Sequence, residues 1–359
     1  MSTILIKNGT LIDGSGSKRY LADILIENEK IKKMGKLDLT ADKVIDASGK
    51  IVSPGFIDTH SHSDLKVLIE PFVEPKIRQG ITTEILGQDG ISMAPLPEEY
   101  VSSWRKNLAG LDGDSDELKW DWKNTDGYLN LISKTGSGPN ELYLVPHGNI
   151  RMEAMGLEAR VATKEELEKM KEITRREMEA GVAGLSTGLI YIPCAYAETE
   201  ELIEICKVAA EYGRPLVIHQ RSEADTMLES MQEVIRIAKE SGVKIHFSHF
   251  KICGQKNWKL IEPVIALLDK CKEEGINVSY DQYPYVAGST MLGVILPPWA
   301  HAGGTDKLIE RLKDKSLREK MKEDIIKGIP GWDNFIDFAG FDGIYVTSVK
   351  TDKNQDCIG

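Results

Sequence analysis

Between residues 163 and 275, strand-like and helix-like segments alternate, and this pattern constrains the fold more than any other feature of the sequence. Thr163 and Glu166 form a capping-box pattern, and apolar residues spaced three and four apart continue to Gly181, which predicts a helix. Three more helices each follow a short apolar strand: one around residues 202–212, one ending at Gly242 and one ending at Gly275. Because each helix returns the chain to the edge where its strand began, these strands are expected to be parallel.

Seven segments have the pattern of strands in this sheet: FIDTHSHSD, TTEILGQDG, ELYLVPHGN, GVAGLSTGL, PLVIHQR, KIHFSHFK and NVSYDQYPY. A closed TIM-like (β/α)8 barrel needs eight strands. A charged helical stretch at 307–327 and the run GIYVTSV at 343–349 remain, and the latter is a candidate for the eighth. The sequence thus predicts an α/β fold with a barrel over residues 56–359.

Residues 1–55 have a different pattern, with short alternating or β-branched runs separated by Asn8-Gly9 and Asn28-Glu29. Asn-Gly pairs between such runs are typical of turns in antiparallel sheets. We expect a small antiparallel β subdomain, of the β-sandwich kind, before the barrel.

Charge and cysteine usage narrow the classes of partner and compartment. The chain has 45 basic and 56 acidic residues, a net charge of −11, and no basic stripe interleaved with aromatic residues, which argues against nucleic acid or an anionic membrane as partner and favours a small molecule. Its five cysteines are scattered without C-x-x-C spacing, which argues against a disulfide framework or a thiolate zinc knuckle. With no signal-like N-terminus or run of about 18 apolar residues, a cytoplasmic location is expected.

His60 and His62 lie two apart at the end of a predicted strand, so both imidazoles face the same side and can reach one cation. A chain with seven histidines contains about 0.14 such pairs by chance, so the pair alone does not establish a metal site. His219 and His249 also lie where strands lead into helices, the end at which parallel barrels build their sites. For any one of these histidines the alternative is a packed or surface imidazole. His246 is expected to face the other side of its strand, and His301 lies in a loop.

Two further strand ends carry polar residues. Asp89 lies in the sequence GQDG, where its carboxylate could approach or bridge metal ions; a turn aspartate is an equally good interpretation. His147, in VPHGN, is a candidate contact to a substrate oxygen, with a capping or loop histidine as the alternative.

Two cations and a tyrosine suggest how a substrate is held. Arg221 and Lys251 each lie two residues beyond a strand-end histidine, nearer the barrel mouth, where they could bind a substrate carboxylate. Solvated cations, or an ion pair with Glu223, are the alternatives. Tyr283, in DQYPY, could donate a hydrogen bond to an oxyanion, or pack as an ordinary aromatic residue.

The segment PGFIDTHSHSD resembles the opening of metal-dependent amidohydrolases. The runs GITTEILGQDGISMAPL, GLSTGLIYIPCAYA, HQRSEAD, HFSHFK and DQYPY are similar to the N-acyl-D-amino-acid deacylase branch of that superfamily, and the resemblance covers essentially the whole chain. It implies one or two Zn²⁺ ions. The ligands it implies are His60, His62, His219 and His249, with Tyr191, Lys251, Tyr283 and Ser289 lining the substrate pocket.

The sequence departs from that branch at two points. Members commonly carry a metal-binding cysteine in a GNCG-like turn, where this chain has Asp89, and harder ligation can change metal preference. The branch also has a general-base aspartate in an SDG-like motif on the eighth strand, which this chain does not contain before Gly359. A fragment of a longer protein, whose barrel lacks its closing strand, is therefore expected, with GIYVTSV as part of an insertion.

The expected reaction is hydrolysis of the amide of an N-acyl-D-amino acid to a carboxylate and a D-amino acid. Zinc would be held mainly by Asp89, His219 and His249, and Tyr283 would steady the oxyanion. One alternative is a cyclic amidase resembling dihydroorotase or hydantoinase, although the strand GVAGLSTGL offers no lysine for the bridging carbamate of those enzymes. A second alternative is an inactive fragment or non-catalytic homologue.

Overall fold

The computed structural model describes residues 2–349 and 351–358, which fold into two compact units. The first consists of the described residues of Met1–Ile57 together with Gly80–Thr82, and the second of those of Asp58–Gln79 and Thr83–Gly359.

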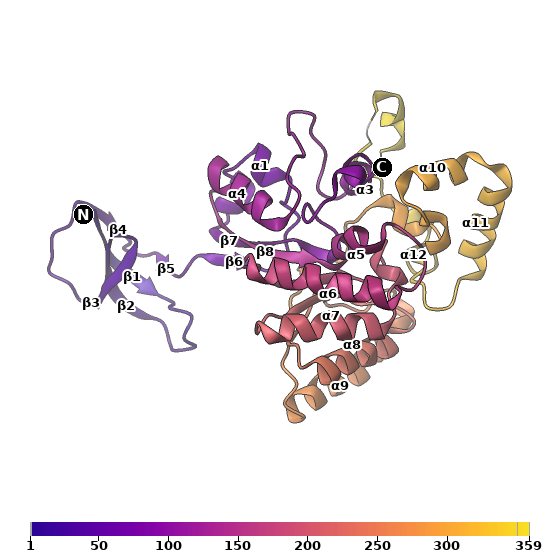
Figure 1. The fold of residues 1–359 in the computed structure, drawn as a ribbon. Coiled ribbons are helices and arrows are strands. Elements are labelled where there is room, and N and C mark those ends of the chain that lie inside the picture. Colours follow the sequence, from indigo (N-terminus) through magenta and orange to yellow (C-terminus); the bar gives the residue numbers. More distant parts are fainter. Residues whose placement is uncertain (1, 350, 359) are drawn as a thin grey trace. The chain divides into compact units, whose positions relative to one another are not determined.

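The first five strands, all in the first unit, form one sheet in the order β3-β2-β1-β4, with β5 also paired to β1 (Figure 1). Its strands are β1 (Thr3–Leu11), β2 (Tyr20–Glu27), β3 (Lys30–Gly35), β4 (Lys43–Asp46) and β5 (Ile51–Val52). The strands β1, β2 and β3 are antiparallel, whereas β4 and β5 run parallel to β1. The sheet is therefore mixed rather than antiparallel, because residues 36–42 carry the chain back before β4 begins. The described residues of this unit form one layer, not the two of a sandwich.

Asn8-Gly9 is a bulge within β1 rather than the expected turn, since the pairing with β2 shifts between Ile6 and Gly9 and Asn8 has a φ of 61°. A Cβ on Gly9 would lie 2.6 Å from Val52 Cγ2, so the close approach of β5 explains the glycine. Asn28-Glu29 is the turn between β2 and β3, as predicted, and both residues have positive φ.

The seven predicted strands of the second pattern form one sheet in the order β12-β11-β10-β9-β8-β7-β6. They are β6 (Phe56–Asp58), β7 (Ile81–Leu86), β8 (Asn140–Pro146), β9 (Gly184–Gly188), β10 (Leu216–His219), β11 (Ile245–Phe247) and β12 (Val278–Tyr280). The pairs from β7 to β12 are parallel, which confirms the α/β prediction. Among the described residues β6 and β12 are the sheet edges, and residues 344–349 of GIYVTSV form no strand.

Five helices pack side by side in chain order along this sheet (Figure 1). They are α5 (His147–Met155), α6 (Lys164–Glu179), α7 (Thr199–Glu211), α8 (Met227–Ser241) and α9 (Ile261–Glu273). The capping box of α6 is present, with Glu166 N donating to Thr163 Oγ1 and Thr163 N donating to Glu166 Oε2. Fully buried side chains such as Leu185, Leu202 and Ile218 join the helices to the sheet, each worth about 1.5–3 kcal/mol on burial.

The remaining helices are α1 (Lys66–Ile69), α2 (Glu74–Ile77), α3 (Val101–Leu108), α4 (Thr125–Thr135), α10 (Thr305–Lys313), α11 (Lys315–Lys327) and α12 (Phe335–Ala339). The charged stretch at 307–327 forms two helices instead of one. Asp314 separates them because its carboxylate caps α11, accepting from the backbone N–H groups of Ser316 and Leu317. None of the described helices combines the length and apolar character of a membrane span.

Candidate metal centre

The carboxyl ends of four strands bring the predicted metal ligands together. His60 and His62 follow β6, Asp89 lies in the turn after β7, His219 ends β10 and His249 follows β11. Because parallel strands end at the same edge of a sheet, residues 60 to 249 of the chain meet in one place.

The five side chains form two donor groups that share Asp89. The first donor group is His60, His62 and Asp89, and the second is Asp89, His219 and His249; the ligand atoms of each lie within 4.8 Å of one another. In the first group, Asp89 Oδ2 lies 3.6 Å from His60 Nε2 and 3.3 Å from His62 Nε2. In the second, Asp89 Oδ1 lies 3.7 Å from His249 Nε2, which is 2.9 Å from His219 Nδ1. Oδ2 of Asp89 thus faces His60 and His62, and Oδ1 faces His249, whose ring is in contact with His219.

The chemistry of these donors fits a metal ion of the zinc type. Asp89 is 2 % exposed, and its Oδ1 has no hydrogen-bond partner. Burial by itself would raise the pKa of the Asp89 carboxyl, but His60 and the other imidazoles hold it well below its usual range. Burial lowers the pKa of His219 to about 3, so its ring is neutral and keeps a lone pair. Zinc accepts neutral imidazoles and ionised carboxylates as ligands. Against the effect of burial, the carboxylates Asp112 and Asp89 raise the pKa of His62 to about 10, and Glu223 and Asp89 raise that of His249 to about 9, so a metal ion would have to displace a proton from each of these rings.

Glycines on either side hold Asp89 in its turn. Asp89 has a φ of 58°, and a Cβ on Gly87 would lie 2.1 Å from Leu144 O. Ser186 Oγ on β9 donates to Gly87 O and accepts a hydrogen bond of 3.1 Å from Gly90 N. Asp89 is therefore a turn aspartate whose turn is built to direct it at the histidines, so the two interpretations of GQDG are compatible.

Two carboxylates that the sequence did not single out for this purpose hold His249. Glu223 is 5 % exposed; its Oε1 lies 3.1 Å from His249 Nδ1 and accepts from Lys251 Nζ at 2.8 Å. Asp281 Oδ1 accepts from the backbone N–H of His249 at 2.5 Å. Burial would raise the pKa of Glu223, but His219, His249 and Lys251 lower it to about 2. Two sequence signals could have found them: Glu223 lies four residues after His219, and Asp281 directly follows β12.

Three of the predicted substrate-binding residues lie beside the second donor group. Lys251 is bound to Glu223, and its Nζ lies 5.4 Å from the centre of the Tyr283 ring. The edge of the Tyr191 ring approaches His219 with 5.4 Å between centroids, and its hydroxyl lies 2.9 Å from Thr290 Oγ1.

The other predicted substrate-binding residues have different surroundings. Arg221 pairs with Glu233 at 2.8 Å and donates to two backbone carbonyls, so its guanidinium is already occupied. His147 is fully buried between Thr187 Oγ1 at 2.9 Å and Glu201 Oε1 at 2.8 Å, a place that suits a packed histidine better than contact with substrate. Ser289 is exposed in the loop after β12. The expectation that His246 faces the helices is wrong, because His246 pairs in register with Val217 and so shares the sheet face of His219. Its Nε2 lies 2.8 Å from Asp281 Oδ2, and the alternation assumed along this strand does not extend to His249, which has a φ of 36°. His301 bonds to Gly293 O.

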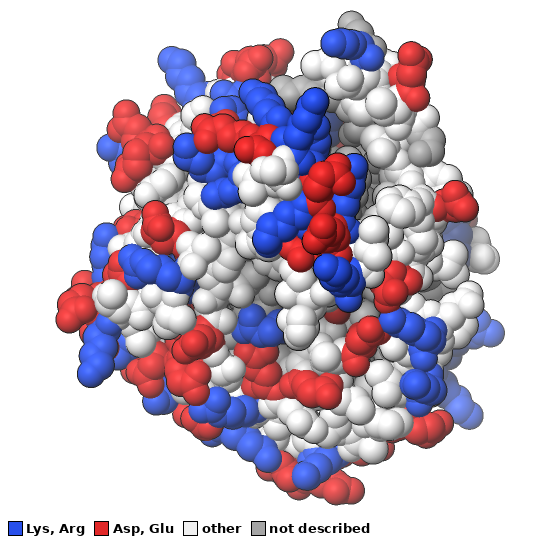
Figure 2. Space-filling view, turned by 90° about the vertical axis from the view of Figure 1, so that its right-hand side faces the viewer, with Lys and Arg blue, Asp and Glu red and all other residues white. Residues whose placement is uncertain are grey.

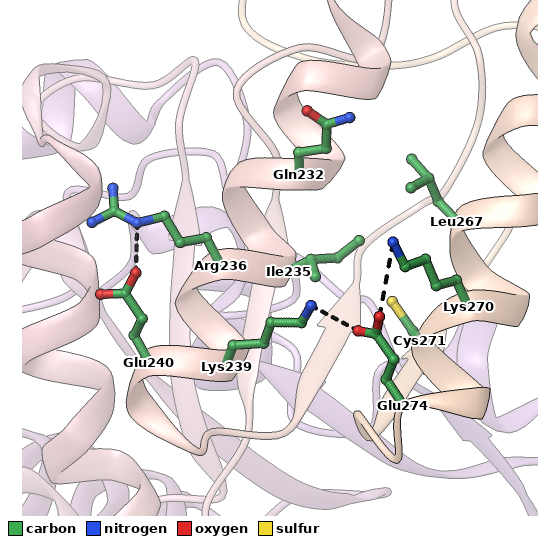
Figure 3. A pocket seen from close by; sticks show the side chains of 9 residues that line it. All are labelled: Gln232, Ile235, Arg236, Lys239, Glu240, Leu267, Lys270, Cys271 and Glu274. Carbon is green, nitrogen blue, oxygen red and sulfur yellow. Dashed lines mark hydrogen bonds and ion pairs between the residues drawn. The ribbon is translucent and has the colours of Figure 1, made fainter.

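A hollow of about 430 Å³ lies on the outer surface between α8 and α9 (Figure 3). Its charged side chains are paired with one another, Arg236 with Glu240 and both Lys239 and Lys270 with Glu274. None of its lining residues belongs to a donor group, so it is separate from the candidate metal centre. On the face drawn in Figure 2, basic and acidic side chains are intermixed.

Comparison with known proteins agrees with this geometry. Residues 43–270 match the model of the amidohydrolase family. The chain is 36% identical over 290 residues to the D-aminoacylase of Alcaligenes xylosoxydans xylosoxydans, a match that covers 80% of this chain and 58% of that protein. It therefore spans a little over half the length of this relative.

Two crystal structures are similar as well. An N-acyl-D-glutamate deacylase from Bordetella bronchiseptica, complexed with zinc and a phosphonate mimic of the tetrahedral intermediate, has a TM-score of 0.73 and 35% identity, over 79% of this chain and 58% of that one. A D-aminoacylase structure has a TM-score of 0.74 and 32% identity, over 89% of this chain and 69% of that one.

Proposed function

The chain belongs to the amidohydrolase family, and from that premise we propose that it hydrolyses the amide bond of N-acyl-D-amino acids, giving a carboxylate and a D-amino acid. The observation that carries the proposal is the pair of donor groups that share Asp89 at the carboxyl ends of the strands. The zinc complex of the similar deacylase supports zinc as the metal.

Zinc would be held by His60, His62 and Asp89 in the first donor group and by Asp89, His219 and His249 in the second. When bound, zinc polarises a carbonyl and lowers the pKa of a water molecule from about 15.7 toward about 7.

The surrounding side chains would hold the substrate. The ammonium group of Lys251 is the cation beside the second donor group, and a substrate α-carboxylate would bind it in competition with Glu223. Burial raises the pKa of the Tyr283 phenol, so this group stays protonated and can donate to an oxyanion. Arg221 is not needed for this role because Glu233 neutralises it.

The two carboxylates that hold His249 are engaged in other contacts. Glu223 binds Lys251 and His249, and Asp281 accepts from His249 N, Thr59 Oγ1 and His246. Both oxygens of each carboxylate already have a polar partner. We therefore assign no general base among the described residues.

The proposal is tested by metal analysis and by an assay with N-acetyl-D-amino acids, using the L enantiomers as the control. Release of the D-amino acid with bound zinc is expected, and His219→Ala and His249→Ala should lose zinc while His301→Ala keeps it. Full zinc content in both donor-group variants would show that the ligands are assigned wrongly.

A parallel assay with hydantoins and dihydroorotate tests the cyclic amidase alternative. No structural observation favours it, because β9 offers no lysine for a bridging carbamate. Ring opening without cleavage of linear amides would overturn the proposed substrate class, and zinc binding without any hydrolysis would favour a non-catalytic chain.

A further inference from the structure

Asp112 is a buried carboxylate outside the two donor groups. It lies in the loop after α3, where its backbone N–H donates to Leu108 O at 2.9 Å. Its side chain is fully covered, and neither carboxylate oxygen has a hydrogen-bond partner among the described residues. The basic atom beside it is His62 Nδ1, 3.5 Å from Asp112 Oδ1. An ionised carboxylate in the interior is costly unless a partner offsets its burial. The contact with His62 Nδ1 is therefore the one that can stabilise Asp112.

His62 lies between two carboxylates, one on each ring nitrogen. Its Nε2 lies 3.3 Å from Asp89 Oδ2, and its Nδ1 faces Asp112. A neutral imidazole has one N–H and one lone pair, so the partner of one nitrogen decides what the other offers. An ionised carboxylate only accepts hydrogen bonds. With the proton on Nδ1, the lone pair of Nε2 is directed toward the first donor group.

Asp64 lies near both side chains, but its carboxylate hydrogen-bonds to the turn that carries Asp89. Its Oδ1 accepts from Gly87 N at 2.8 Å and from Ser92 Oγ, so it holds the start of the Asp89 turn. The ligand atoms of His62, Asp64 and Asp112 lie within 4.8 Å of one another and could hold a cation of their own. That would need the lone pair at Nδ1 of His62 and would take a ligand from the first donor group. A hydrogen bond to Asp112 keeps the first group complete.

We propose that Asp112 is a positioning residue for His62. Its carboxylate accepts a hydrogen bond from the Nδ1–H of His62, so that the ring presents Nε2 to the metal ion that the first donor group would hold. The inference deepens the proposed function and rests on it, because it assumes that this group binds a metal. Such outer carboxylates orient the ring of a ligating histidine and fix its tautomer.

The decisive variant is Asp112→Asn, which keeps the size of the side chain but can donate its amide N–H to Nδ1 and so favour the wrong tautomer. The matched control is Asp116→Asn, in the same loop, whose fully exposed side chain pairs with Arg105. Zinc titration should show binding at the first donor group weakened by about 10- to 100-fold in Asp112→Asn, with the second group and the control unchanged.

A spectroscopic readout separates positioning from a general loss of structure. In the zinc-loaded parent protein, ¹⁵N NMR of His62 should show Nδ1 protonated and Nε2 bound to metal, and Asp112→Asn should lose this pattern. The parent spectrum tests the proposal even if the variant does not fold.

Three outcomes would overturn the inference: equal zinc affinity in Asp112→Asn and the parent, a proton on Nε2 of His62 in the parent, or a third zinc ion in the parent that Asp112→Asn loses. The last would make the cluster a metal site. If the parent itself bound no zinc, the proposed function would fail, a result distinct from an Asp112→Asn variant that binds like the parent.

Discussion

Two residues of the donor groups have positive backbone φ angles, which residues other than glycine rarely adopt. Asp89 has a φ of 58° and His249 a φ of 36°. Such conformations persist only where surrounding contacts enforce them. Asp89 is held by its glycine neighbours and Ser186, and His249 by Asp281, which accepts its backbone N–H. The sequence GQDG shows the glycines but not the partners on other strands, which lie up to about a hundred residues away along the chain.

We expect Gly87→Ala to destabilise the protein far more than a glycine substitution in open space. The new Cβ would lie 2.1 Å from the backbone oxygen of Leu144, which cannot move aside, in addition to the strain of a φ of 79°. Gly213→Ala is the matched control, because Gly213 has a φ of 66° and nothing within 4 Å of the added Cβ. Urea unfolding should show a loss of about 3 kcal/mol for Gly87→Ala against about 1–2 kcal/mol for the control. Equal losses would mean that backbone strain alone explains the glycine.

Asp89→Asn should weaken zinc binding at both donor groups while leaving the fold intact. Asparagine tolerates positive φ as aspartate does, but it removes the negative charge that both groups share. Zinc per chain after dialysis against buffer should fall at both groups, with each affinity reduced at least about 10-fold. An undiminished zinc content would show that Asp89 is not a ligand.

At the scale of elements, local patterns predicted the strands and helices well. The capping box of Thr163 and the C-terminal glycine of α8 act within one turn, so the sequence displays them directly. Contacts between elements were harder to predict. Glu223 reaches His249 across 26 residues and Asp281 reaches it across 32, and Asp112 approaches His62 from a loop with no strand pattern. Such partners depend on which strands pair, and a single segment does not contain that information.

Strand pairing also places two carboxylates together, and this gives a pH-dependent prediction. Glu84 on β7 is opposite Glu141 on β8, and burial raises the pKa of Glu141 to about 7, above its usual 4.5. Because the pKa is higher in the folded chain than in the unfolded chain, protonation of Glu141 stabilises the fold. This stabilisation is fully present below pH 4.5 and is lost as the pH rises through 7. Glu141→Gln stays neutral and should therefore gain stability over the parent as the pH rises.

The expected gain is about 1 kcal/mol above pH 7, allowing for the partial exposure of Glu141, and close to zero at pH 4.5. Melting temperatures of metal-free parent and variant between pH 4.5 and 8 provide the measurement. A constant difference across this range would mean that Glu141 titrates normally.

At the scale of the whole molecule, the order of the seven-stranded sheet could be read from the succession of strands and helices, because short right-handed connections leave few alternatives. The sheet of the first unit could not. Its strand β4 is parallel to β1 because of where residues 36–42 lead the chain, and short β-branched runs carry no signal for that direction. Local hydrophobic patterns identify strands, but the direction of pairing depends on the connections.

Removal of metal should destabilise the second unit as a whole. The donor groups join four strands that span residues 60 to 249, and an ion bound only by the folded chain stabilises it by mass action. At free zinc about a thousand times the dissociation constant, the stabilisation is about 4 kcal/mol. Calorimetry should show a higher melting temperature with zinc, reversed by EDTA. A triple variant with His60→Ala, His219→Ala and His249→Ala, in which both donor groups are disabled, should show no response to zinc. A response that persisted in this variant would place the ion elsewhere.

The single carboxylate between the donor groups also makes the two affinities interdependent. One oxygen of Asp89 faces each group, so an ion on one side withdraws negative charge from the other and repels a second cation at short range. The two binding events are therefore expected to be negatively cooperative. By thermodynamic linkage, the penalty that the first ion imposes on the second is the same whichever group fills first. A titration of this centre would then show two steps of unequal affinity even if the two sets of histidines were chemically identical.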